Sequence, residues 1–62
     1  MEYYVRFYKK DKSIDSEYFY SRVDDAKKHL ASFEDDDSEL YDCIELIKYE
    51  NHEDSILHTL RF

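Results

Sequence analysis

The sequence predicts a small α+β domain in which two strands, one helix and two further strands follow one another. Three observations lead to this ββαββ prediction. Apolar and polar residues alternate with a period of two over 1–9 and 14–20, as in half-buried strands. The spacing changes to three and four residues over 21–34, which is typical of an amphipathic helix. Strand-like runs return over 40–49 and 55–62, so we expect the 62 residues to form a single domain.

The first two strands are predicted from their alternation and from the polar turn at residues 9–13. One face of the first strand is apolar and consists of Met1, Tyr3, Val5 and Phe7. The inward face of the second strand stays open, because Tyr18 and Tyr20 share one side with Ile14 while Phe19 lies on the other. A β-bulge near residues 16–18 would reconcile the two sets.

The helix is predicted from its first turn and its apolar stripe. Ser21 is a suitable N-cap residue, and Asp24 follows at the position of a capping-box partner. The apolar stripe consists of Val23, Ala26, Leu30 and Phe33. We expect the helix to end near Glu34, because the acidic residues that follow are unfavourable at a helix C-terminus.

The third strand, residues 40–49, is apolar on both faces, which is typical of a central strand. In the fourth strand we expect Ile56 and Leu60 to face inward and Leu57 to face outward, from their alternation. The arrangement most consistent with these patterns is an antiparallel sheet in the order 2-1-3-4 with the helix on one face. Its predicted core is Tyr3, Val5, Phe7, Val23, Ala26, Leu30, Phe33, Ile44, Leu46, Ile56 and Leu60.

The face of the sheet opposite the helix receives the aromatic residues that alternation directs away from the core. We expect its exposed residues to be Tyr4, Tyr8, Ile47, Tyr49 and Leu57. An exposed apolar patch of this kind usually marks a contact site. The sequence therefore predicts a non-enzymatic interaction module that binds a protein partner, or forms a homodimer, through this face.

The chain has 16 acidic and 9 basic residues, and its net charge is −7. Such a field repels phosphate backbones, so direct nucleic-acid binding is not expected. The same charge gives an alternative function, in which carboxylates imitate a phosphate array and block a DNA- or RNA-binding protein, as small phage or mobile-element inhibitors do. The candidate acidic surface consists of Asp24, Asp25, Glu50, Glu53 and Asp54, with Glu2 beside them.

Catalytic, cofactor and metal sites are not predicted. His29, His52 and His58 have no partner at the spacing of metal ligands, and we expect His29 at the surface. Cys43 is interpreted as a packing residue. The acidic run 34–39 has no glycine for the sharp turn of a calcium loop, and is interpreted as a solvated loop.

The compartment is predicted from the single cysteine and from the distribution of apolar residues. One thiol cannot form an internal disulfide, which is usual for a reducing compartment. The chain also has no apolar stretch of the roughly 20 residues that a membrane span needs. We therefore expect a cytoplasmic protein without a membrane partner.

Overall fold

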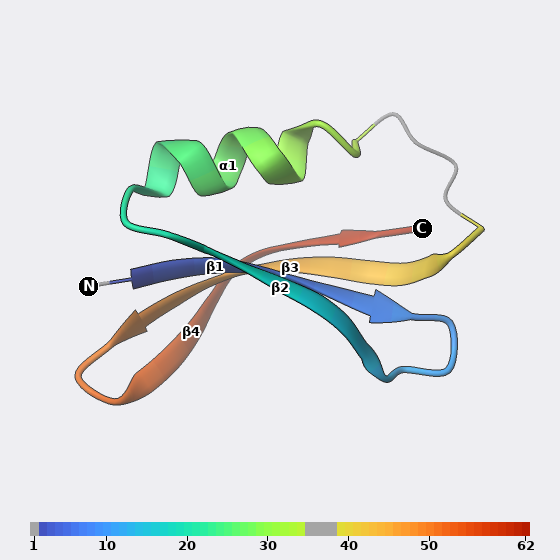
Figure 1. The fold of residues 1–62 in the computed structure, drawn as a ribbon, viewed down its shortest axis with the longest axis horizontal. Coiled ribbons are helices and arrows are strands. Elements are labelled where there is room, and N and C mark those ends of the chain that lie inside the picture. Colours follow the sequence, from blue (N-terminus) through green and yellow to red (C-terminus); the bar gives the residue numbers. More distant parts are fainter. Residues whose placement is uncertain (1, 35–38) are drawn as a thin grey trace.

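The protein is a four-stranded antiparallel sheet with one helix packed on one of its faces (Figure 1). The computed structural model describes residues 2–34 and 39–62. The elements along the chain are β1 (Glu2–Lys9), β2 (Ile14–Tyr20), α1 (Val23–Ala31), β3 (Tyr41–Glu50) and β4 (Glu53–Arg61). The strand order is β2-β1-β3-β4, so the predicted fold class and strand order are confirmed.

A β-bulge at Asp15 determines which residues of β2 face the helix. The register changes at this residue, because Tyr8 pairs with Ile14 whereas Phe7 pairs with Ser16. Ile14 therefore lies on the face away from α1, and the even-numbered residues after the bulge lie on the helix side. The bulge occurs just before the segment in which the alternation predicted it.

A second bulge, at Leu57, divides β4 in the same way. Ile47 pairs with Ile56 and Leu46 pairs with His58, so Leu57 is an extra residue without a counterpart in β3. In the part of β4 that precedes Leu57, residues predicted to face α1 therefore face away from it, and the reverse. Placing Ile56 in the core was therefore wrong, since it lies on the face away from α1 and is 61% exposed. Placing Leu57 on that face was also wrong, because it borders a groove beside the helix.

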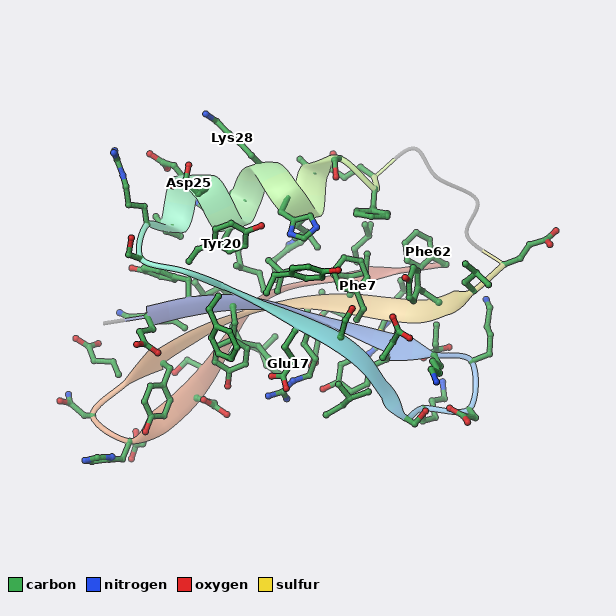
Figure 2. The ribbon with its side chains drawn as sticks, viewed as in Figure 1. Phe7, Glu17, Tyr20, Asp25, Lys28 and Phe62 are labelled. Atoms are coloured by element: carbon green, nitrogen blue, oxygen red, sulfur yellow. The ribbon has the colours of Figure 1, made fainter. Side chains whose placement is uncertain are left out.

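The core lies between the sheet and α1. Of the other residues predicted for the core, some are fully buried and others only partly. Its buried residues are Val5, Phe7, Ala26, Leu30, Ile44 and Leu46, and the predicted Tyr3, Phe33 and Leu60 pack against them partly buried. Val23 is half-buried. Figure 2 shows Phe7 and Tyr20 between the helix and the sheet, whereas Asp25 and Lys28 point away from the sheet.

The helix is shorter than predicted at both ends. The N-cap residue is Arg22, which has an extended backbone and makes no side-chain capping bond, so the predicted Ser21 capping box was wrong. After Ala31 the chain tightens, because the amide of Glu34 donates to the Ala31 carbonyl at 3.1 Å. Such shorter-range bonds commonly complete a helix C-terminus.

His29 is half-buried under the helix, and its predicted surface position was wrong. Its Nδ1 atom lies 2.7 Å from the hydroxyl of Tyr20, and its ring packs against Phe7, Tyr18 and Phe33. Burial lowers the pKa of His29 from its usual value of 6.5, because desolvation disfavours the charged imidazolium. His29 therefore belongs to the aromatic layer that joins α1 to β1 and β2.

The connection between β3 and β4 is a two-residue turn of Asn51 and His52 with backbone φ angles of 54° and 63°. Positive φ at both central residues is the signature of the tight turn that best matches the twist of a hairpin. The chain contains no glycine, so both residues carry a Cβ in this left-handed conformation. Asparagine adopts this conformation more readily than histidine, because its short polar side chain can hydrogen-bond to the nearby backbone.

No helix within residues 2–34 and 39–62 has the length and apolar character needed to cross a membrane.

Candidate interaction surface

The face of the sheet opposite α1, here called the open face, is crossed by a row of apolar residues from all four strands. Tyr4 pairs with Phe19 on one side and with Ile47 on the other, and Ile47 pairs in turn with Ile56. We call these four residues the apolar row. Figure 1 shows that the helix covers only the other side of the sheet. Within residues 2–34 and 39–62, no helix or further strand therefore packs on the apolar row.

The centre and the ends of the apolar row differ in exposure. Tyr4 and Ile47 are only 6% and 1% exposed, so the prediction that both are exposed was wrong. At the ends, Phe19 and Ile56 are 66% and 61% exposed. The Phe19 ring lies 5.4 Å from that of Tyr4, which accounts for part of the cover over the centre. The row thus has a buried floor between two exposed apolar side chains.

Arg6 supplies another part of that cover. Its guanidinium carbon lies 5.1 Å from the centroid of the Tyr4 ring, in cation–π geometry. The guanidinium donates to the hydroxyls of Tyr8 at 3.3 Å and Tyr4 at 3.4 Å, and forms an ion pair with Glu17 at 3.1 Å. Arg6 therefore places its aliphatic stem and its charge over the tyrosines, as long basic side chains commonly do.

Two tyrosine hydroxyls on this face have altered acidity. Burial and a hydrogen bond to Asp54 raise the pKa of Tyr4 to about 12. Burial, together with a hydrogen bond to Glu45, raises the pKa of Tyr8. Both phenols therefore release their protons less readily than an ordinary tyrosine does.

Carboxylates lie on both sides of the apolar row. On one side of it, Tyr49 pairs with Glu2 and with Asp54. On the other side, Arg6 pairs with Glu17 and with Glu45. We call Glu2, Glu17, Glu45 and Asp54 the acidic rim. Figure 2 shows Glu17 on the side of the sheet away from the helix. The open face thus has an apolar centre with a negative border.

Four of the five residues predicted for this surface lie together on the open face: Tyr4, Tyr8, Ile47 and Tyr49. Leu57 does not, because its bulge turns it toward α1. Sequence reasoning missed the three most exposed apolar residues of the face, which are Ile14, Phe19 and Ile56. The position of Phe19, opposite in parity to Tyr18 and Tyr20, was the available signal.

The acidic residues of the alternative surface gather at the end of the sheet where α1 begins and the β3–β4 turn lies (Figure 1). Glu50 and Glu53 face each other across that turn, and Asp24 and Asp25 lie in the first turn of the helix. Lys48 forms an ion pair with Glu50 at 3.2 Å, which offsets part of this charge.

At the opposite end of the sheet, Lys12 pairs with Asp42 at 2.7 Å, and this bond lowers the pKa of Asp42. Lys9 and Lys10 border the same shallow groove as Glu39. The basic turn therefore lies beside acidic residues at this end of the sheet. Most of the acidic run 34–39 falls outside the described residues.

The described residues contain no group of three or more His, Cys, Asp or Glu side chains placed to hold a metal ion. Cys43 is buried in β3, and burial together with the nearby carboxylate of Asp42 raises the pKa of its thiol. A thiol of raised pKa is a poor nucleophile, which agrees with its interpretation as a packing residue.

Comparison of the chain with protein-family models, curated proteins and solved structures finds no match. The functional proposals below therefore rest on the geometry of the open face.

Proposed function

We propose that the protein is a non-enzymatic interaction module that binds a partner protein through its open face. The observation that carries this proposal is the apolar row, with Phe19 and Ile56 exposed at its two ends. Exposed apolar patches bordered by polar residues are typical of protein-contact sites. The rigid four-stranded sheet holds the row in place, so little ordering would be needed on binding.

The acidic rim favours a basic partner over a second copy of the chain. Two open faces in contact would bring carboxylates of like charge together, and each chain has a net charge of −7. A partner that presents apolar side chains within a basic border would complement the same surface. Homodimer formation is the competing outcome, and sedimentation equilibrium over a range of concentrations would detect it.

The test compares three variants at exposed apolar positions. Phe19→Ser and Ile56→Thr alter the open face, while Leu40→Ser is the matched control because Leu40 is 73% exposed at the other end of β3. Proteins retained from a host extract by the wild type are identified, and the affinity of each purified candidate is measured. We expect at least a tenfold loss for each open-face variant and wild-type affinity for the control. Equal binding by all three variants would contradict the proposal.

The acidic mimic is the second candidate, supported by the clustering of Glu50, Glu53 and Asp54 with Glu2 at one end of the sheet. A mimic of phosphate should bind a nucleic-acid-binding protein with steep salt dependence. Its affinity should fall in the Glu50→Gln/Glu53→Gln variant and stay unchanged in Phe19→Ser. Measuring the identified partner at two salt concentrations with both variants decides between the two candidates.

A further inference from the structure

At one end of the open face, a shallow groove of about 300 Å³ combines aromatic rings with carboxylates. It is lined by three aromatic and three acidic residues: Tyr4, Phe19, Tyr49, Glu2, Glu17 and Asp54. These residues come from all four strands, so the sheet pairing holds them in place. The groove includes one exposed end of the apolar row and three of the four residues of the acidic rim.

We infer that this groove binds the cationic side chain of a lysine or arginine presented by the partner protein. The inference rests on the proposed function and specifies the chemistry of the partner. A guanidinium or ammonium group is attracted to the face of an aromatic ring within about 6 Å of its centroid. Carboxylates at the border of the same groove supply charge-assisted acceptors for its N–H groups. A groove that contains both aromatic rings and carboxylates is therefore complementary to an organic cation.

The protein already contains one example of this binding mode. Arg6 places its guanidinium 5.1 Å from the Tyr4 ring and 3.1 Å from the Glu17 carboxylate. The open face therefore accommodates a guanidinium against an aromatic ring and a carboxylate. Because Arg6 pairs with Glu17, the carboxylates of Glu2 and Asp54 are the acceptors that remain for a second cation.

The groove residues also argue against the other classes of ligand. Three carboxylates repel a phosphate or another anion. A bare metal ion requires converging ligands, and no group of acidic or histidine residues among those described is placed to provide them. Asp54 and the aromatic ring of Tyr4 line the same groove. An aliphatic stem with a terminal positive charge matches this combination of apolar wall and acidic border.

The inference is tested with a single amino acid, so no partner needs to be known. The isotope-labelled protein is titrated at low salt with N-acetyl-arginine amide, N-acetyl-lysine amide and the neutral N-acetyl-citrulline amide, and amide shifts are followed by NMR. We expect saturable shifts for both cations, with a dissociation constant on the order of millimolar, confined to the groove residues. Citrulline should shift the same amides at least tenfold less.

Matched charge-removal variants complete the experiment. Asp54→Asn should weaken arginine binding at least fivefold, and Tyr49→Leu should do the same through loss of a ring. Asp25→Asn removes an equal charge from the far side of the helix and should leave binding unchanged (Figure 2). Equal shifts with citrulline, or shifts spread over the acidic residues of α1, would overturn the inference.

The results separate this inference from the proposed function. If arginine fails to bind the groove while partner binding still depends on Phe19 and Ile56, the inference is wrong and the proposed function stands. If arginine binds the groove but partner binding survives both substitutions, the proposed function is wrong.

Discussion

Each face of the sheet buries one isoleucine of β3, but the two isoleucines are covered by different means. On the covered face, Ile44 is fully buried because α1 packs over it. On the open face, Ile47 is 1% exposed although no helix lies above it. Side chains of the sheet itself, including Arg6 and Phe19, cover that centre. A sheet of four strands can therefore close part of a second core with one layer of side chains, while the ends of that layer, Phe19 and Ile56, stay exposed.

The largest expected effect compares Ile44 and Ile47, two isoleucines on opposite faces of β3. Truncation of a buried isoleucine to alanine costs about 2–5 kcal/mol, depending on how well the site collapses. We expect Ile44→Ala near the upper end of this range, because the helix and sheet hold its surroundings rigid. Ile47→Ala should lie near the lower end, because exposed side chains can move in. Urea unfolding of both variants measures the difference, and a larger loss for Ile47→Ala would break the comparison.

An intermediate effect concerns pH and the covered face. The pKa of His29 is lowered by burial, so the unfolded state binds more protons than the folded state as the pH falls through 6.5. The stability that depends on neutral His29 is fully present above pH 6.5, the pKa in the unfolded chain. It is lost as the pH falls toward the lower pKa of His29 in the folded protein. We expect wild-type stability to decrease between about pH 7.5 and 5.5, and this slope to be smaller in His29→Gln.

Tyr20→Phe is the control for this prediction, because it removes the hydroxyl that contacts His29 without removing the titrating group. Tyr20→Phe should lower the free energy of unfolding at every pH and leave its dependence on pH unchanged. An unchanged slope in His29→Gln would show that other groups produce it.

The smallest expected effect concerns the turn at the end of the open face. His52 has a φ angle of 63°, and a left-handed conformation costs a residue with a Cβ roughly 1–2 kcal/mol. Glycine relieves this cost but loses more backbone entropy, so His52→Gly should stabilise the protein by about 0.5–1 kcal/mol. Asn51→Gly is the comparison and should gain less, since asparagine tolerates this conformation. Thermal unfolding of the two variants checks the order.

The fold was predictable because the period of the apolar pattern changes where the helix begins and where it ends, and because polar turns separate the two strands of each hairpin. Strand order followed from β3, which is apolar on both faces and therefore central. The face of the sheet on which each strand residue lies was less predictable. Each bulge inserts one residue and reverses the facing of every residue before it, so Ile56 and Leu57 exchanged places. Neither Asp15 nor Leu57 carries a local signal, such as glycine, that marks a bulge.

The candidate surface was predictable in its location but not in its exposed residues. Alternation placed Tyr4 and Ile47 on the correct face, yet it contains no information about which neighbours cover them. The burial of Tyr4, for example, depends on Arg6 and on Phe19, and Phe19 meets Tyr4 only through the pairing of β1 with β2. His29 illustrates the same limit on the covered face, because its aromatic neighbours come from β1 and β2 as well as α1.

The bulges in β2 and β4 also affect how the molecule avoids uncontrolled association. β2 and β4 are the outer strands, and the outer edge of a sheet exposes backbone N–H and C=O groups that can template pairing with another chain. Proline, a common block at such edges, is absent from this sequence. One extra residue in each outer strand, Asp15 or Leu57, interrupts the regular ladder that an added strand would need. The same insertions that move Ile14 and Ile56 onto the open face thus discourage growth of the sheet at its edges, while they add apolar side chains to the face for which we propose partner binding.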